Sequence, residues 1–322
     1  MIKEMPVKLS IIIVNYKTPE LCIDCLKSIK MGKGIEVIIV DNASSDGSLE
    51  LIRDAIELLN SDLISLIDSK HNGGFSAGNN IGIRASKGKY CLLLNSDTIV
   101  RPGAVEKMVR LVDENPSIGI ASPRLESLDG SPQESCFNFY RPINEFIKAS
   151  GTGVITKMLQ GYQLSVPLCQ ENTFPEWVSF ACVLIQRRVF DSIGLLDEGY
   201  FMYFEDVDFC LKARSAGWEL INIPSAQLVH LQSASSKVNS KISSKARLPR
   251  YFYESRARYY STHFGMFGLI RANIFWHVGW LISMVRRLLD KKYRANIYRQ
   301  QWRDIWINCF DPKGPYIHPE KY

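Results

Sequence analysis

The sequence predicts an α/β fold: a mostly parallel β-sheet with helices on both faces. Over residues 8–125, short apolar runs alternate with amphipathic helical segments, and near-continuous apolar strands are typical of a parallel sheet that is buried on both sides. Three of these strands also end in polar side chains, at Asn15-Tyr16, Asp41-Asn42 and Asn95-Ser96-Asp97. Ligands bind beyond the carboxyl ends of parallel strands, so we expect a binding site there.

The elements of the first half follow in regular order. Apolar runs of strand length lie at Leu9–Tyr16, Ile35–Val40, Leu63–Asp68 and Tyr90–Leu94. Between and after them, helices are expected from Pro19 to about Met31, after Ser45-Asp46-Gly47 to about Leu59, after the Gly-rich stretch His71–Asn80 to about Ala85, and from Pro102 to about Asn115. Proline is tolerated in the first turn of a helix, so Pro19 and Pro102 mark helix starts.

The second half of the chain is less regular. Residues 118–140 suggest short strands and turns, and residues 141–175 form a poorly periodic insertion. Trp177–Gln186 is predicted as one buried strand with a short helix after it, and Tyr203–Arg214 as a helix with three carboxylates in its first turn. After Gly217, residues Trp218–His230 are expected to form a strand, a turn and a second strand.

Composition limits the class of protein. The chain has 322 residues, of which 46% are hydrophobic and 22% charged, as in folded soluble proteins. Its start lacks the pattern of a signal peptide. Of the eight cysteines, only Cys22 and Cys25 form a CxxC pair, which lies in a helical pattern without a second pair, so a zinc site is not expected. These features favour a reduced, cytosolic protein.

Charge is distributed unevenly and sets the C-terminal region apart. Residues 1–240 hold 23 Lys and Arg against 28 Asp and Glu, whereas residues 241–304 hold 14 against 3. Apolar residues recur at helical spacing from Ile270 to Leu288, but the uncharged run between Arg271 and Arg286 is shorter than the ~20 residues of a membrane span. We expect an amphipathic helix lying on anionic lipid. The alternative is a helical hairpin packed on the preceding α/β domain or forming a homodimer interface.

Several other classes are disfavoured. The basic region lacks a recognised nucleic-acid-binding module, so no nucleic acid is expected. The first strand is followed by Lys17-Thr18-Pro19, which is not the glycine fingerprint of a dinucleotide-binding fold, and the chain contains no P-loop motif. A nicotinamide-dependent dehydrogenase and a P-loop NTPase are therefore excluded as first hypotheses.

Candidate chemistry rests on carboxylates and one histidine. Asp97, at the end of a strand, suits a divalent cation, and His230 is a plausible second ligand. Asp97 could instead be a turn residue, and His230 a structural histidine. A carboxylate among Glu205, Asp206 and Asp208 could serve as a general base, although acids at a helix start are also favoured by the helix dipole alone.

An ordered set of motifs resembles a known family. The stretches are SIIIVNY from Ser10, VDNASSDGS at 40–48, NGGFSAGNN at 72–80, LLLNSDT at 92–98 and FMYFEDVDFCLKARSAGW at 201–218, with His230 after them. Together they cover roughly residues 8–235, and the chain resembles the family 2 glycosyltransferases of the GT-A fold, in particular rhamnosyltransferase-like members. The resemblance implies a catalytic domain over 1–245, with a nucleotide-sugar part at about 8–125 and an acceptor part at about 126–245. Residues 246–322 would form a basic, aromatic-rich helical extension.

The resemblance also implies roles for individual residues. Asp41 would hydrogen-bond the pyrimidine base of the donor, and the remaining donor-binding residues would be Asn15, Tyr16, Asn72, Gly73, Asn79 and Asn95. Asp97 and His230 would hold Mg²⁺ or Mn²⁺ at the diphosphate. Asp206 would be the catalytic base, supported by Glu205 and Asp208. Where the family has a small residue, this chain has Phe180, which either intrudes on the acceptor site or faces the core.

The implied reaction is an inverting, metal-dependent glycosyl transfer. The expected donor is a dTDP- or UDP-sugar, with dTDP-rhamnose as the first choice, and the expected acceptor is a glycan or a polyprenyl-linked sugar. The process would be synthesis of a bacterial surface polysaccharide such as O-antigen, at the inner face of the cytoplasmic membrane. Alternatives are a UDP-hexose or UDP-N-acetylhexosamine transferase, an inactive nucleotide-sugar-binding module, and a sugar nucleotidyltransferase, which the absence of a Gly-rich signature after the first strand disfavours.

Overall fold

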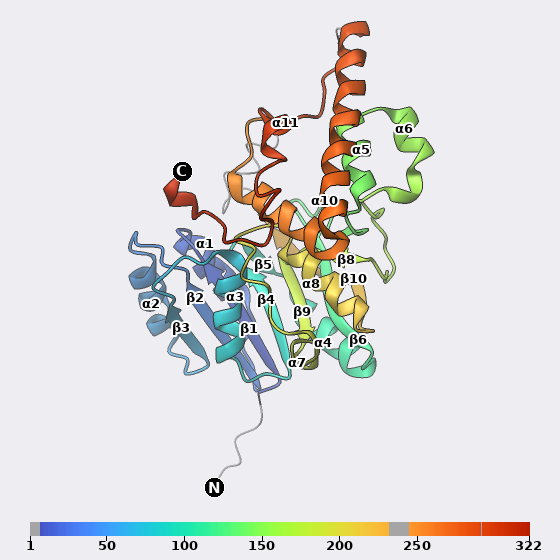
Figure 1. Ribbon diagram of the computed structural model, residues 1–322. Helices are drawn as coiled ribbons and strands as arrows, with labels where there is room; N and C mark the ends of the chain where they lie inside the picture. The colour runs from blue at the N-terminus through green and yellow to red at the C-terminus, as the bar shows by residue number, and fades with distance from the viewer. Residues whose placement is uncertain (1–6, 232–244, 291) are drawn as a thin grey trace. The chain divides into compact units, whose positions relative to one another are not determined.

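The computed structural model describes residues 7–231, 245–290 and 292–322 of the chain (Figure 1). They belong to two compact units. Unit 1 comprises Met1–Phe137, Pro167–Glu198 and Asp206–Ser236, and unit 2 comprises Asn138–Val166, Gly199–Glu205 and Lys237–Tyr322. The division at residue 245 into a catalytic domain and an extension concerns function, and it stays a prediction.

Unit 1 is built on an eight-stranded sheet with the strand order β3-β2-β1-β4-β9-β6-β10-β5. Strands β1 to β4 run parallel, β9 is antiparallel to β4 and β6, and β5 is antiparallel to β10. The bounds are β1 (Leu9–Asn15), β2 (Ile35–Asp41), β3 (Ile64–Asp68), β4 (Tyr90–Asn95), β5 (Thr98–Val100), β6 (Ile118–Glu126), β9 (Cys182–Gln186) and β10 (Glu219–His230). A separate two-stranded sheet pairs β7 (Cys136–Phe137) with β8 (Trp177–Val178). The predicted mostly parallel α/β fold is confirmed.

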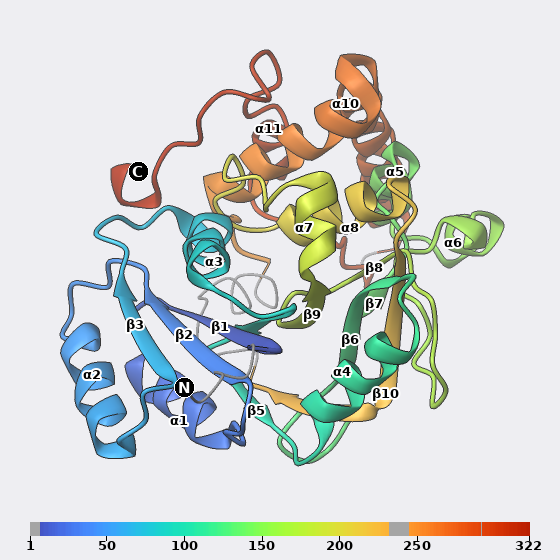
Figure 2. The same cartoon turned by 90° about the horizontal axis from the view of Figure 1, so that it is seen from below.

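Helices cover both faces of this sheet. They are α1 (Pro19–Ser28), α2 (Ser48–Leu59), α3 (Gly74–Ala85), α4 (Ala104–Glu114), α7 (Arg187–Ile193) and α8 (Glu205–Ser215). Figure 2 shows α1 and α2 on one side of β1, β2 and β3, and α3 on the other side. The parallel strands therefore direct their carboxyl ends to one edge of a sheet that is shielded from water on both faces.

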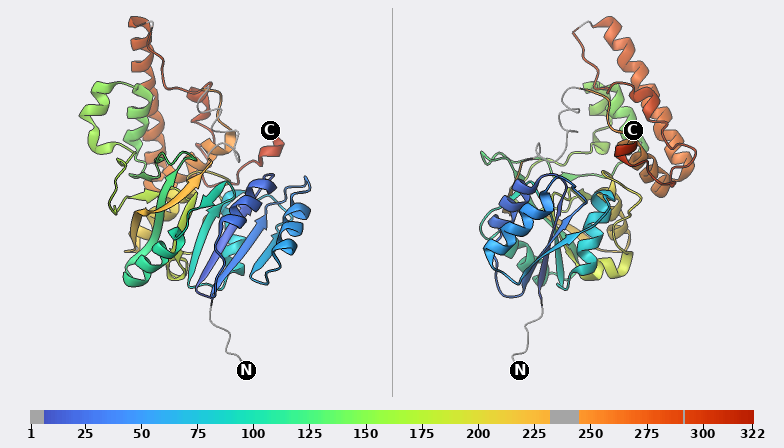
Figure 3. Two further views of the ribbon diagram at one scale, coloured as in Figure 1. Left: turned by 180° about the vertical axis from the view of Figure 1, so that it is seen from behind. Right: turned by 90° about the vertical axis from the view of Figure 1, so that its left-hand side faces the viewer.

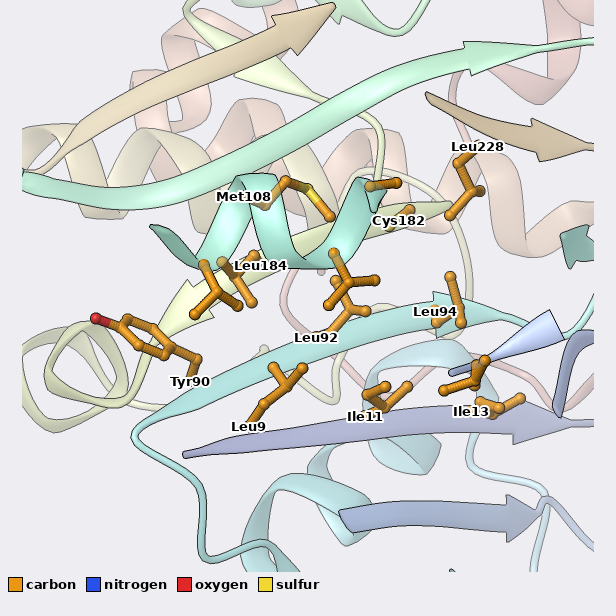
Figure 4. Close-up of a cluster of buried hydrophobic side chains, with 14 of the residues drawn as sticks. Leu9, Ile11, Ile13, Tyr90, Leu92, Leu94, Met108, Cys182, Leu184 and Leu228 are labelled. Carbon is orange, nitrogen blue, oxygen red and sulfur yellow. The ribbon is translucent and has the colours of Figure 1, made fainter. Parts of the chain in front are cut away.

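The alternation of side chains along β1 explains this arrangement. Leu9, Ile11 and Ile13 join a core cluster with α1 and α4 side chains on one face of the sheet (Figure 4). The intervening residues point to α3, and a Cβ at Gly82 would lie only 2.4 Å from Cγ2 of Ile12. Gly78, within the Gly-rich stretch, is equally close, since a Cβ there would lie 2.8 Å from Cγ1 of Val14. Glycine at these two positions thus lets α3 approach the strand closely.

Three sequence-based expectations for unit 1 are corrected by the structure. Trp177–Gln186 is not one strand, because Ser179–Ala181 separates β8 from β9. Trp218–His230 is not a strand-turn-strand, because β10 is continuous, with a register shift between Ile223 and Gln227. The shift falls at Pro224, which has no N–H to donate to a ladder. The short strand Thr98–Val100 was not expected, since its three residues carry no periodic signal.

Unit 2 is helical. Its main element is α10 (Arg250–Leu289), which is kinked at Gly265, where φ is 67°. The other elements are α5 (Pro142–Ser150), α6 (Gly153–Met158), α11 (Gln301–Asp304) and the 3₁₀ turns η1 (Gln160–Tyr162) and η2 (Pro319–Lys321). Figure 3 shows α5 alongside α10. The insertion that lacks clear periodicity in the sequence therefore supplies the helix that packs on α10.

A buried ion pair anchors α5 to α10. Arg256 is only 3% exposed; its Nε donates to Oε1 of Glu145 at 2.8 Å, and its guanidinium also donates to Oδ1 of Asn273 at 2.8 Å. The ring of Tyr260 lies 5.0 Å from the guanidinium carbon. Because a buried charge is costly unless it is paired and hydrogen-bonded, this network fixes how the two helices pack.

The turn before α8 has an unusual backbone. The helix predicted to start at Tyr203 begins at Glu205, because Tyr203 and Phe204 have φ values of 71° and 68°. Aromatic side chains of α10 pack against this turn: the Phe204 ring lies 5.4 Å from that of Tyr259 and 5.7 Å from that of Phe252. Two consecutive bulky residues with positive φ are strained, so this packing holds the turn in place.

Among the residues that the structure describes, no helix is both long and apolar enough to cross a bilayer.

Candidate active site

The carboxyl edge of the parallel strands gathers the predicted donor-binding residues. Asn15 at the end of β1 is in register with Asp41 at the end of β2, and Val14 is in register with Asn95 at the end of β4. The sheet therefore brings Asn15, Asp41 and Asn95 to one edge, as expected from the sequence.

Asp41 is held by a dense set of hydrogen bonds. Its Oδ1 accepts from Nδ2 of Asn15 at 2.8 Å and from Oγ of Ser44 at 2.6 Å, and its Oδ2 accepts from the backbone N–H of Ser44 at 3.0 Å. The residue is 2% exposed. A carboxylate offers about four acceptor sites, so Oδ2 has capacity for one further donor. Ser44 was not among the predicted site residues, although an Asp followed three residues later by Ser is a recognisable turn signal.

The other predicted donor-binding residues differ in their surroundings. Oδ1 of Asn72 accepts from Nδ2 of Asn42, the neighbour of Asp41, at 2.9 Å. Gly73 is the residue that precedes α3. The buried Asn79 donates from Nδ2 to the Phe75 carbonyl of its own helix at 3.0 Å, an intrahelical bond that ties it to the helix backbone.

Tyr16 follows directly after β1. It is half-buried, and Nζ of Lys17 lies 5.0 Å from the centroid of its ring. Tyr16 therefore lies next to Asn15 at the end of β1, and its role as a donor-binding residue stays a prediction.

The two predicted metal ligands are brought together. Nε2 of His230 lies 3.5 Å from Oδ1 of Asp97, and Asp97 is 1% exposed. The antiparallel pairing of β10 with β5 produces this proximity, since His230 is in register with Thr98, and the Leu231 N–H donates to the Asp97 carbonyl at 2.9 Å. The unexpected strand β5 is therefore what places these two side chains side by side.

This pair fits a divalent cation that accepts both carboxylate oxygen and imidazole nitrogen, such as Mn²⁺. Two ligands at right angles around such an ion are about 3 Å apart, close to the separation of Asp97 and His230. Within the described ranges, no group of three or more His, Cys, Asp or Glu could hold a metal. Mg²⁺ is commonly bound by one or two carboxylates, together with water and substrate phosphates, so a site with a single carboxylate and few protein ligands suits a phosphate-bearing ligand.

Asp206 lies in the first turn of α8 and has a perturbed acidity. Burial raises the pKa of its carboxyl to about 7, against the opposing effect of hydrogen bonds from the backbone N–H groups of Val207, Asp206 itself and Phe180. The Val207 N–H to Oδ1 distance is 2.8 Å. The residue is half-buried, so it retains access to solvent. A carboxyl with this pKa can exchange protons near neutral pH.

The Phe180 segment connects Asp206 to the strand edge. Phe180 is 2% exposed, and its ring lies 5.9 Å from the ring of Phe209 in an edge-to-face arrangement, so the Phe180 side chain faces the core. Of the two alternatives left open by the sequence, the core-facing one is therefore correct. The next carbonyl, that of Ala181, accepts from the Asn95 N–H at 2.9 Å. The loop that holds Asp206 through a backbone amide is thus bonded to the end of β4.

The other two acids of the cluster are also buried. Asp208 is 1% exposed and forms an ion pair with Nζ of Lys212 at 2.7 Å, one helical turn further on. Glu205 is 7% exposed. Asp208 is neutralised by its lysine partner, so the support for Asp206 that was predicted from Glu205 and Asp208 stays a prediction.

Comparison with solved structures identifies the class of fold. A mannosyltransferase from Pyrobaculum calidifontis, solved with GDP-Man and Mn²⁺, aligns with a TM-score of 0.55 and 14% identity, over 89% of this chain and 76% of that one. GalNAc-T7, solved with UDP, GalNAc and Mn²⁺, aligns with a TM-score of 0.52 and 16% identity, over 71% and 44%. The fold is GT-A, as predicted.

Sequence comparison then gives the family. The model described as Glycosyl transferase family 2 matches residues 10–164, and the one described as Glycosyl transferase family group 2 matches residues 90–290. The chain belongs to the family 2 glycosyltransferases.

Two curated relatives give the degree of similarity. The low-salt glycan biosynthesis hexosyltransferase Agl10 of Haloferax volcanii is 32% identical over 69% of this chain, which spans 65% of that protein. The N-acetylglucosaminyl-diphospho-decaprenol L-rhamnosyltransferase of Mycobacterium tuberculosis is 25% identical over 65% of this chain and 70% of its own length.

Proposed function

We propose that this protein transfers a hexosyl group from a nucleoside diphosphate sugar to a hydroxyl of a glycan or polyprenyl-linked acceptor, with inversion at the anomeric carbon. The observation that carries the proposal is the proximity of Asp97 and His230, two residues from distant parts of the chain, at 3.5 Å beside the strand edge that holds Asp41. Family membership supports the reaction class.

The donor base is recognised by Asp41. Its Oδ2 has room for one more hydrogen bond, and the imide N–H of uracil or thymine is a donor of the required type. Both bases carry this group, so the contact selects a pyrimidine imide without separating a UDP-sugar from a dTDP-sugar. Asn15 orients the carboxylate through its own bond to Oδ1.

The chain's residues divide the chemistry between two ends of the reacting bond. Asp206 accepts the proton of the acceptor hydroxyl while that oxygen forms a bond to the anomeric carbon, and the bond from this carbon to the diphosphate oxygen breaks. Attack from the face opposite the leaving group inverts the configuration. Asp97 and His230 would hold Mg²⁺ or Mn²⁺, which when bound neutralises charge on the departing diphosphate.

The donor sugar is proposed to be L-rhamnose carried on dTDP, and the acceptor a polyprenyl-linked sugar. Support comes from the mycobacterial relative, whose name specifies L-rhamnose transfer to a decaprenol-linked N-acetylglucosamine. A relative in Myxococcus xanthus, named O-antigen biosynthesis protein RfbC, supports a role in surface polysaccharide synthesis. Such acceptors are embedded in membrane, so the proposed location is the inner face of the cytoplasmic membrane. The second candidate, a UDP-hexose or UDP-N-acetylhexosamine transferase, is favoured by the hexosyltransferase relative of Haloferax volcanii.

The direct test is a donor panel. Purified protein is incubated with UDP-glucose, UDP-N-acetylglucosamine and dTDP-rhamnose, with and without Mn²⁺, and released nucleoside diphosphate is measured. The proposal expects turnover of one donor that is lost with EDTA and restored by Mn²⁺. Donor binding without turnover, even with a polyprenyl-diphosphate-sugar acceptor present, would instead indicate an inactive binding module. In that case Asp206→Asn and wild type would behave alike.

A further inference from the structure

In the second half of α10, after the kink at Gly265, one face of the helix packs against other residues of unit 2. Leu269 and Trp276 are buried on this face, and Oγ of Ser283 donates to the Ala149 carbonyl of α5 at 2.9 Å. A Cβ at Gly279 would lie 2.6 Å from the Phe146 carbonyl oxygen. The helix is therefore in close contact with α5 along this side.

The opposite face carries an exposed apolar stripe. We call it the outer stripe and define it by Phe267, Ile274, Val278, Leu281, Val285 and Leu288, which are between 44% and 89% exposed. At about 100° per residue these six side chains fall within a sector of roughly 80°, and they extend over about 32 Å of helix. Monomeric proteins rarely leave a continuous apolar surface of this length in water, so the outer stripe indicates an interaction site.

Charge along the outer stripe is mostly positive, with one exposed acid, Asp290, at its end. Between Glu254 and Asp290 the sequence contains no acidic residue, and it contains Arg256, Arg258, Arg271, Arg286 and Arg287. Of these, Arg271 and Arg287 are exposed on the part of α10 that carries the stripe, and Lys292 and Arg294 follow it as exposed cations. A long apolar surface accompanied by a strong excess of positive charge is complementary to an anionic lipid surface.

Tryptophan side chains accompany the same helix. Trp306 is 40% exposed, and its Nε1 donates to Nε2 of His277 on α10 at 2.9 Å. The two rings stack with centroids 5.9 Å apart, and Trp302, one turn earlier, is 53% exposed. Tryptophan is enriched where proteins meet the headgroup region of a bilayer, because its ring is apolar and its N–H is polar.

We propose that the outer stripe binds the surface of an anionic phospholipid bilayer, with α10 lying in the plane of the membrane. A second copy of the chain fits less well, because it would bring together two surfaces that each carry an excess of positive charge, with Asp290, at the end of α10, as the one exposed acid along each stripe. The purpose of this surface rests on the proposed function, since it would bring the enzyme to a lipid-linked acceptor. The test of membrane binding does not measure glycosyl transfer, so its outcome does not depend on the proposed function.

The experiment is co-sedimentation of the full-length protein with phosphatidylcholine vesicles that contain or lack phosphatidylglycerol. Leu281→Gln/Val285→Gln on the outer stripe is compared with Leu58→Gln/Leu59→Gln, a matched pair of exposed leucines on α2. We expect wild type and the α2 variant to bind anionic vesicles alike, and the outer-stripe variant to bind more than about tenfold more weakly. Hydrolysis of the donor in solution should be unchanged in both variants.

Charge substitutions give a second measurement. Arg287→Gln/Lys292→Gln should weaken binding to phosphatidylglycerol vesicles several-fold for each charge removed, and leave binding to pure phosphatidylcholine unchanged. Equal vesicle binding by wild type and the outer-stripe variant would overturn the proposal. Absence of vesicle binding by wild type would also overturn it. A third contrary result would be self-association without vesicles, measured by analytical ultracentrifugation, that is present in wild type and lost in the outer-stripe variant. The last result would assign the stripe to a second copy.

Discussion

Two carboxylates of unit 1, Asp41 and Asp206, lie in contrasting environments. Asp41 accepts three hydrogen bonds from Asn15 and Ser44, so it is held as a fixed acceptor. Asp206 also accepts hydrogen bonds from backbone N–H groups, but desolvation by burial outweighs them and raises the pKa of its carboxyl to about 7. The first environment suits recognition by an oriented acceptor and the second suits proton transfer, in agreement with the different roles proposed for the two carboxylates.

Among the substitutions that test this contrast, Asp206→Asn is expected to have the largest effect. Amide nitrogen and oxygen preserve the size of the side chain but cannot accept a proton, so we expect kcat to fall by about 10³-fold, equivalent to about 4 kcal/mol of transition-state stabilisation. For wild type, log kcat/KM should rise with pH up to about 7 and then level, since the ionised carboxylate is the active form. Steady-state kinetics across this pH range measure both. A variant that kept the rising limb would place the base elsewhere.

The next effect concerns the metal site. Asp97→Ala removes one of two proposed ligands and should weaken Mn²⁺ binding by about 10²-fold, and His230→Ala by less, because a neutral ligand contributes less charge. Electron paramagnetic resonance of free Mn²⁺, in the presence of a nucleoside diphosphate, measures binding without turnover. Asp62→Asn, an exposed acid of unit 1, is the control. Undiminished Mn²⁺ binding in Asp97→Ala would contradict the assignment.

The pH dependence of the free energy of unfolding is a further test of the difference between Asp206 and Asp41. The pKa of Asp206 is about 7 in the folded protein and about 3.9 in an unfolded chain, so between these values only the folded state holds the proton. The associated stability is fully present below about pH 4 and is lost as the pH rises through about 7. Asp206→Asn lacks this titration. The free energy of unfolding of Asp206→Asn, relative to that of wild type, should therefore rise by about 2 kcal/mol between pH 4 and pH 8. This value is reduced to allow for the partial solvent access of Asp206. Urea unfolding at several pH values measures it, and a constant difference would argue against the raised pKa.

At the other carboxylate a smaller effect is expected. Asp41→Asn replaces a charged acceptor by a neutral one and should raise the Kd for UDP or dTDP about tenfold while kcat changes little. Calorimetric titration reports the Kd directly. Asp46→Asn, five residues further along the same loop and exposed, serves as the matched control. An equal loss in both variants would mean that the loop, not the Asp41 contact, is responsible.

The smallest expected effect is at Ser44. Ser44→Ala removes the Oγ donor to Asp41 but leaves the backbone N–H bond in place, so the Kd should rise about threefold. Titration with UDP again measures the change. An effect as large as that of Asp41→Asn would show that the orientation of the carboxylate matters as much as its charge.

The sequence predicted the parts of this site that follow from regular alternation. Apolar strands of the expected length place Asn15, Asp41 and Asn95 at one sheet edge, and parallel register makes that outcome nearly unavoidable. The proximity of Asp97 and His230 came from the motif resemblance, because the three-residue strand that creates it has no periodicity to detect. The core-facing Phe180 was equally beyond local reasoning, since which way its ring points depends on Phe209, a residue of another element.

Tyr203 and Phe204, which both have positive φ, limit where the chain can be truncated without disturbing Asp206. Residues 199–205 belong to the same compact unit as α10, and Asp206 is the very next residue. A polypeptide cut at residue 245 would lose Phe252 and Tyr259, which hold this strained turn, and the turn would be free to relax toward ordinary backbone angles. Shortened versions or chimaeras that exchange the C-terminal segment would then inherit a displaced carboxylate. The practical rule for engineering is to transplant both segments together or neither.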